Sequence, residues 1–132
     1  MIPDDEKARC AITGLRHGID WRLLIALRET ENGRPGLEFG VEDPAADTFD
    51  KQADEAARTI RHTIGRFARN VTPGEWWDEV RGRYVADFLH YFSRGGLGYQ
   101  GYAPIGATND PANLNKNHFG NLVQHYGEQC PP

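Results

Sequence analysis

Apolar residues recur at helical spacing through most of the chain and predict about five helices. The first two cover residues 4–17, which end at Gly18, and residues 20–31, which Asn32 and Gly33 follow. Asp20 is a residue type that caps helix starts, and Asn-Gly pairs commonly end helices. The segment 20–31 is the most apolar helix of the chain, so we expect it at the centre of the fold.

Three further helices are predicted: residues 49–70, residues 72–94, and a last helix that opens at Asp110 and has Tyr126 as its final apolar position. Within 49–70, at about 100° per residue, the apolar side is formed by Ala57, Ile60, Ile64, Phe67 and Ala68 and the opposite side by Arg58, Arg61, His62, Arg66 and Arg69. Gly- and Pro-rich stretches at 33–48 and 95–109 predict two long loops. No segment predicts a strand. The fold class is therefore mainly α, with about five helices around a central apolar helix.

The composition refines this picture. The chain has 132 residues, which predicts a single domain over 1–132. Its mean hydropathy of −0.66 is low, yet it carries 3 Trp, 5 Tyr and 6 Phe, residues that disordered segments lack. We therefore expect a folded chain whose low apolar fraction reflects the two long loops.

Charge and residue spacing exclude several classes of protein. The net charge of −4 argues against a general nucleic-acid binder. No apolar run is long enough for membrane insertion, and the acidic start is unlike a cleavable secretion signal. The five His never reach the helical spacing of a metal site, so we expect no metal and no cofactor. Cys10 and Cys130 form either one disulfide or two unrelated thiols.

Two carboxylates stand at the end of the apolar helix, and their helical angles separate them. Glu31 falls within about 40° of Leu24 and Leu27 and continues the apolar stripe, whereas Glu29 lies beside Arg22 on the polar side. Burial penalises the charged form of a carboxyl, so we expect a raised pKa for Glu31. A carboxylic acid that stays protonated near neutral pH can act as the general acid in glycosidic cleavage.

The segment 19–33, which ends in Glu31-Asn32-Gly33, resembles the catalytic helix of the lysozyme-like superfamily. That group includes lytic transglycosylases, goose-type lysozymes and glucosaminidases, in which an apolar helix ends in the catalytic Glu. Phe39-Gly40-Val41 resembles the Phe-Gly-Ile turn of glucosaminidases. The segment from Tyr102-Ala103-Pro104 to Leu114-Asn115 resembles the region before the last helix in phage-encoded members.

The resemblance implies a set of site residues. Glu31 would be the general acid, although aligning Glu29-Thr30 with the glucosaminidase pattern would give that role to Glu29. The substrate would be bound by residues of the turn and of the segment before and within the last helix: Phe39, Asn109, Asn115 and a tyrosine. An extra stretch at 94–101 leaves open whether that tyrosine is Tyr99 or Tyr102.

The reaction type depends on a second group. An inverting hydrolase needs a second carboxylate about 6.5–9.5 Å from the acid, and Glu42 and Asp43, with Glu38 beside them, are the candidates in the following loop. In transglycosylases a single Glu suffices, because the C6 hydroxyl of the sugar closes a 1,6-anhydro ring.

The leading hypothesis is therefore a peptidoglycan-cleaving glycosidase that cuts the β-1,4 bond between N-acetylmuramic acid and N-acetylglucosamine. Its partner would be the glycan strand of the bacterial cell wall, and we expect a monomer. The alternatives are a non-enzymatic phage structural or glycan-binding protein on the same fold, and a helical interaction domain without sugar chemistry.

Overall fold

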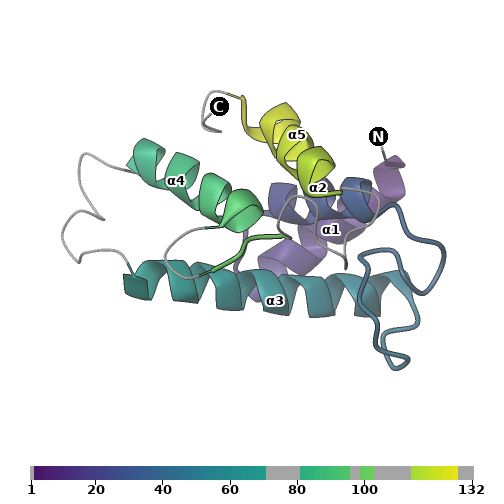
Figure 1. The fold of residues 1–132 in the computed structure, drawn as a ribbon. Coiled ribbons are helices and arrows are strands. Elements are labelled where there is room, and N and C mark those ends of the chain that lie inside the picture. Colours follow the sequence, from purple (N-terminus) through teal and green to yellow (C-terminus); the bar gives the residue numbers. More distant parts are fainter. Residues whose placement is uncertain (1, 71–80, 96–98, 103–113, 128–132) are drawn as a thin grey trace. The chain divides into compact units, whose positions relative to one another are not determined.

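A computed structural model describes residues 2–70, 81–95, 99–102 and 114–127 of the protein. These residues form five helices and no strand, so the predicted mainly α class is confirmed (Figure 1). The chain divides into two compact units, Met1–His62 and Thr63–Pro132. The first unit contains the predicted acid, and the second contains the tyrosines and the last helix.

Helices α1 (Asp4–His17) and α2 (Trp21–Glu31) pack against each other in the first unit. Gly14 permits their close approach, because a Cβ at this position would lie 3.0 Å from the Ile19 carbonyl oxygen. Gly18 ends α1 with a φ of 68°, and the Asp20 side chain accepts a hydrogen bond from the Arg22 N–H at 2.9 Å. The predicted cap residues therefore set both boundaries.

More of the α2 surface is buried than the single apolar stripe predicted from the sequence. Four consecutive residues, from Leu23 to Ala26, are buried, and so is Thr30, whose hydroxyl donates to the Ala26 carbonyl at 2.7 Å. Consecutive residues point in directions about 100° apart, so the middle of α2 is enclosed on several sides. The prediction of a single apolar stripe that leads to Glu31 is wrong for this reason, although the position of the helix in the core is as expected.

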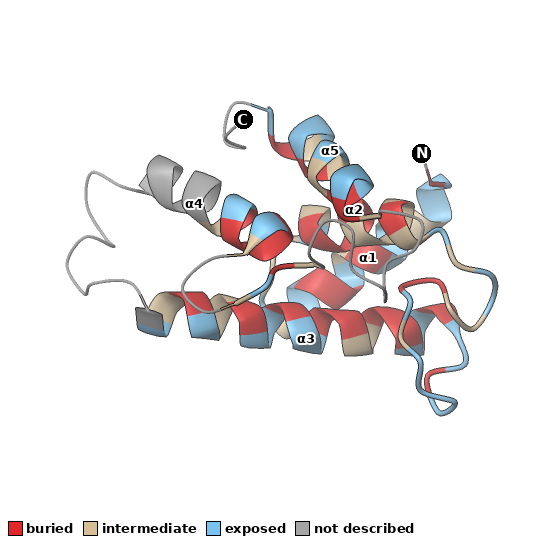
Figure 2. Cartoon of the chain, viewed as in Figure 1, coloured by how far each residue is buried: buried red, intermediate tan, exposed pale blue. Residues whose placement is uncertain are grey.

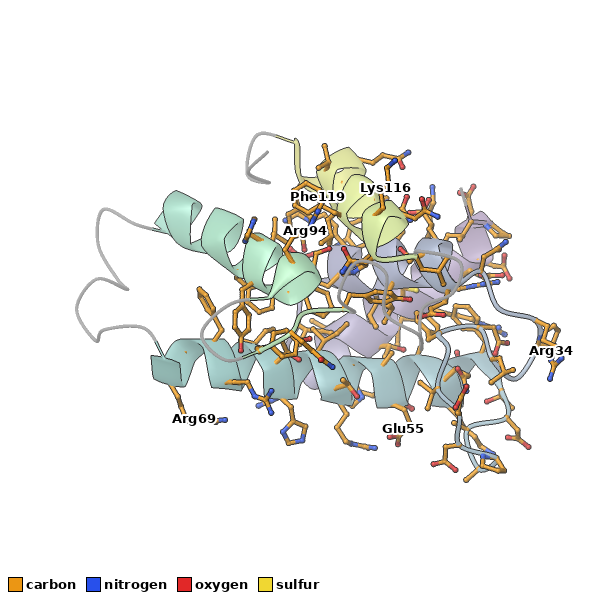
Figure 3. All side chains as sticks on the ribbon, in the orientation of Figure 1. Arg34, Glu55, Arg69, Arg94, Lys116 and Phe119 are labelled. Atoms are coloured by element: carbon orange, nitrogen blue, oxygen red, sulfur yellow. The ribbon has the colours of Figure 1, made fainter. Side chains whose placement is uncertain are left out.

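Helix α3 (Phe49–Asn70) has the predicted two-sided character. Ala57, Ile60 and Phe67 are buried, whereas the predicted basic positions between Arg58 and Arg69 are all exposed (Figure 2). Figure 3 shows the side chains of Glu55 and Arg69 pointing away from the ribbon on this exposed side. The apolar side of α3 supplies core residues to both units.

The second unit contains α4 (Arg81–Arg94) and α5 (Leu114–Tyr126), which pack against each other. The Arg94 guanidinium of α4 lies over the Phe119 ring of α5 at 4.4 Å, a cation–π contact between the two helices (Figure 3). The predicted starts of these two helices, at Thr72 and Asp110, lie outside the described residues.

Candidate active site

Glu31 is the last residue of α2, and its carboxyl lies against the backbone of the loop that follows. A Cβ at Gly40 would lie 2.6 Å from both Cδ and Oε2 of Glu31. Gly40 also has a φ of +71°, which glycine adopts without strain. The 39–41 turn therefore covers one side of the Glu31 carboxyl at a point where a side chain on residue 40 would displace that carboxyl.

This contact distinguishes the two carboxylates of α2. Glu29 and Glu31 are both half-buried, so exposure does not separate them. The end of α2 is set by Asn32, which adopts a left-handed conformation with a φ of 44°. The chain then turns back so that the Gly40 backbone contacts the Glu31 carboxyl. This contact favours Glu31 over Glu29 as the carboxyl of the candidate active site.

Hydrogen bonds from Gln52 of α3, whose side chain is completely buried, hold the Gly40 turn against this helix. Its Oε1 accepts hydrogen bonds from the backbone N–H groups of Phe39 and Val41, both at 3.2 Å. Its Nε2 donates to the Val41 carbonyl at 2.8 Å and to the Ala46 carbonyl at 2.7 Å. One neutral amide therefore satisfies four backbone groups of the loop.

Arg28 binds the part of this loop that precedes Gly40. Its Nε donates to Glu6 at 2.7 Å, in a pair whose side chains are only 11% and 19% exposed. Its Nη1 donates to the Gly33 and Glu38 carbonyls, both at 3.4 Å. The guanidinium therefore joins α1, the end of α2 and the loop before Gly40.

Phe39 belongs to the core and does not line a surface for substrate. It is 3% exposed, and its ring meets the Phe49 ring edge-on at 5.3 Å. The expectation that Phe39 contacts substrate is therefore wrong, because its ring holds the turn against the start of α3.

The three acidic candidates of the loop have different surroundings. Glu38 is buried, and its Oε1 accepts from the Gly36 N–H at 2.8 Å, so it shapes the loop. Glu42 and Asp43 are exposed and line a surface hollow of about 330 Å³ together with Arg34, which projects from the loop (Figure 3). Glu31 is not among the residues that line this hollow.

In the second unit, Ser93 brings two of the predicted binding residues together. The Ser93 carbonyl accepts from the Tyr102 N–H at 3.2 Å and from Nδ2 of Asn115 at 2.8 Å. Asn115 is 2% exposed, so it cannot offer its side chain to a substrate as predicted. It holds the end of α4 instead, whereas Tyr102 is half-buried.

His118 supports the Tyr102 ring from inside the unit. The two rings stack at 4.7 Å, and Nδ1 of His118 lies 3.1 Å from the Ser93 hydroxyl. His118 is fully buried, and its Nε2 has no hydrogen-bond partner in the described part of the chain. Burial lowers the pKa of His118 to about 3, so its imidazole is neutral at neutral pH.

The other predicted tyrosine, Tyr99, belongs to an aromatic cluster. Its ring lies 4.7 Å from the Tyr91 ring, and the Arg66 guanidinium lies over it at 5.5 Å. Burial raises the pKa of Tyr99. Tyr99 and Tyr102 are both half-buried, so exposure does not separate them; Tyr102 differs in that its ring stacks on the neutral imidazole of His118. Asn109 lies outside the described residues.

Sequence reasoning missed Gln52, Ser93 and His118. Gln52 and His118 do carry a signal, because each is a polar residue on the apolar side of its helix, Gln52 with Phe49 and Ala53, and His118 with Leu122. Such a residue needs a hydrogen-bond partner inside the fold. Ser93, one residue before the end of α4, has no comparable signal.

Within the described residues, no three His, Cys, Asp or Glu side chains gather as a metal site would require, and no helix there is both long and apolar enough to cross a membrane. Cys10 is a free, fully buried thiol whose pKa burial raises to about 12. Cys130 lies outside the described residues. Comparison of the chain with protein-family models, curated proteins and solved structures finds no match.

Proposed function

We propose that this chain is a peptidoglycan-cleaving glycosidase with Glu31 as its general acid. The bond cleaved is the β-1,4 linkage between N-acetylmuramic acid and N-acetylglucosamine. The observation that carries the proposal is the contact between the Glu31 carboxyl and the backbone of Gly40 at the end of α2. The resemblance of segment 19–33 to the catalytic helix of lysozyme-like proteins supplies the reaction class.

The position of Glu31 suits proton donation. A carboxylate at the C-terminal end of a helix faces the negative end of the helix dipole, which disfavours its ionised form. The Gly40 turn covers one side of the group and keeps water from that side. Glu31 would protonate the glycosidic oxygen as the bond to the anomeric carbon breaks, and the leaving sugar would depart as an alcohol.

Two routes can complete the reaction. In the first, the C6 hydroxyl of the muramic acid residue attacks its own anomeric carbon, and Glu31 takes up the hydroxyl proton. In the second, a second carboxylate activates water, and Glu42 is the better placed candidate because it follows Gly40 by two residues, at most about 7 Å along the backbone. Asp43 is engaged with the Ala45 N–H at 3.0 Å, which makes it the weaker candidate.

Tyr102, which is half-buried, is proposed to contact the glycan through its aromatic ring. The stacking of His118 beneath that ring supports the proposal, because it fixes the ring orientation without a charge. A rigid aromatic face is a suitable surface for the apolar face of a sugar ring.

Digestion of purified peptidoglycan followed by mass spectrometry of the soluble fragments tests the proposal. We expect fragments that end in N-acetylmuramic acid. Ends lighter by one water would indicate the 1,6-anhydro route, and hydrated ends would indicate water activated by a second carboxylate. Binding to chitooligosaccharides without any release of fragments would contradict the proposal and favour a non-enzymatic glycan-binding protein.

A further inference from the structure

We propose that Gln52 is the positioning residue of this site: by binding the backbone on both sides of Gly40, its amide holds the turn against the Glu31 carboxyl. The role in catalysis rests on the proposed function, because it requires Glu31 to be the acid. The mechanical part of the proposal, that Gln52 fixes the contact between Glu31 and Gly40, does not depend on any activity.

The hydrogen bonds of Gln52 surround Gly40 in the chain. Oε1 accepts from Phe39 and Val41, the residues immediately before and after it, and Nε2 donates to the Val41 carbonyl. The fourth bond, to the Ala46 carbonyl, draws the far end of the loop to the same side chain. Gly40 has no side chain of its own with which to pack, so its position is defined through its two neighbours.

Few side chains could make all four of these hydrogen bonds at position 52. The site needs an acceptor for two N–H groups and, on the same side chain, a donor for two carbonyls, and a primary amide provides both. Glutamate has nearly the same shape, but an oxygen would replace Nε2 and face the carbonyls of Val41 and Ala46. Methionine has a similar length but would leave all four backbone groups without these hydrogen bonds, and the Phe39 N–H and the Ala46 carbonyl are buried.

The competing explanation is that Gln52 only stabilises the fold. The buried Ile60, two turns further along α3, provides the matched control. Ile60→Ala opens a cavity in the same helix and lowers stability, but it removes no hydrogen bond from the loop. A purely structural role predicts that variants of Gln52 and Ile60 with equal losses of stability behave alike in every other respect.

The test compares the wild-type protein with Gln52→Glu, Gln52→Met and Ile60→Ala in two measurements. By NMR, we expect the cross-peak between the side-chain protons of Glu31 and the α protons of Gly40 to weaken in both Gln52 variants and to persist in Ile60→Ala. We also expect amide exchange at Phe39 and Val41 to accelerate about tenfold, the equivalent of one lost hydrogen bond. Retention of the cross-peak and of slow exchange in both Gln52 variants would overturn the proposal.

The second measurement is the rate of glycan cleavage per folded molecule. Misplacement of a catalytic group by about 1 Å costs about 100-fold, so we expect kcat of Gln52→Glu to fall by about that factor while KM changes less than twofold. Ile60→Ala should keep the wild-type kcat below its unfolding transition. An equal loss of kcat in Ile60→Ala would refute the positioning role. If the wild-type protein cleaves no glycan, the proposed function fails, and the NMR measurement alone decides whether Gln52 holds Gly40 against Glu31.

Discussion

Substitution of Gly40 by alanine tests the geometry of the candidate site directly. The new Cβ would lie 2.6 Å from Cδ and Oε2 of Glu31 and would be attached to a backbone with a φ of +71°. Gly36 provides the matched control in the same loop: its φ is +90°, but a Cβ there would meet its nearest neighbour, the Asp47 carbonyl oxygen, at an ordinary 3.7 Å. Both changes introduce backbone strain, and only one introduces a steric conflict with Glu31.

The two contributions can be given magnitudes. A left-handed conformation costs a residue with a Cβ about 1–2 kcal/mol, and alanine recovers about 0.4–1 kcal/mol by restricting the unfolded chain. The Glu31 carboxyl is the far end of a flexible side chain and can move away from the new Cβ, which costs about 0.5–1.5 kcal/mol for a side chain forced off its rotamer. We therefore expect Gly36→Ala to destabilise the protein by about 1 kcal/mol and Gly40→Ala by about 1.5–2.5 kcal/mol, or about 4 °C in Tm per kcal/mol for a chain of this size.

Urea unfolding of a double-mutant cycle isolates the steric contribution. In a Glu31→Ala background the carboxyl is absent, so Gly40→Ala should cost no more than Gly36→Ala, and the coupling free energy should be about 0.5–1.5 kcal/mol. Equal destabilisation by Gly40→Ala and Gly36→Ala in the wild-type background would refute a steric conflict between residue 40 and Glu31. The same cost of Gly40→Ala with and without the Glu31 carboxyl would refute it too.

Three further predictions concern the surroundings of the site. Arg28→Met should destabilise the protein by about 3–5 kcal/mol in urea unfolding, because it leaves the poorly exposed Glu6 carboxylate unpaired; a loss below about 1 kcal/mol would contradict a structural role for the pair. The pKa of His118 is about 3 in the folded state and 6.5 in the reference state, so the unfolded chain binds the extra proton; stability should fall by about 1.4 kcal/mol per pH unit below pH 6.5, and His118→Phe should remove that part of the slope in unfolding measured from pH 7.5 to 4.5. Burial raises the pKa of the Cys10 thiol to about 12, so in a Cys130→Ser variant the thiol should react with a thiol reagent at pH 8 only after denaturant is added, and rapid reaction of the native protein would contradict its burial.

The helices were predictable because their boundaries depend on local chemistry. Gly18, Asp20 and Asn32 are cap residues whose effects act within one turn, and they mark the ends of α1 and α2 in the structure as the sequence predicts. The two-sided pattern of α3 likewise follows from a period of 3.6 residues. The predicted single stripe on α2 is wrong because the helix is enclosed on several sides. Its consecutive buried residues point in different directions, so they define no single apolar face.

The contacts of the site were not predictable, because they depend on the path of a loop. Nothing local to Glu31 indicates that the chain returns nine residues later and brings Gly40 to its carboxyl. Gln52 shows the intermediate case: its place on the apolar side of α3 predicts a buried polar group, but its backbone partners are fixed only by the folded loop. The same holds for His118, whose contacts with Ser93 and Tyr102 come from α4 and the following segment.

The central claim is that Glu31 is the general acid of a peptidoglycan-cleaving glycosidase. The most direct measurement is dye release from labelled peptidoglycan by the wild-type protein, Glu31→Gln and Glu29→Gln, each shown by circular dichroism to be folded. The amide of Gln cannot donate the proton that the leaving oxygen needs. We expect Glu31→Gln to release no dye above background and Glu29→Gln to retain most of the wild-type rate. Release by Glu31→Gln at the wild-type rate would contradict the account.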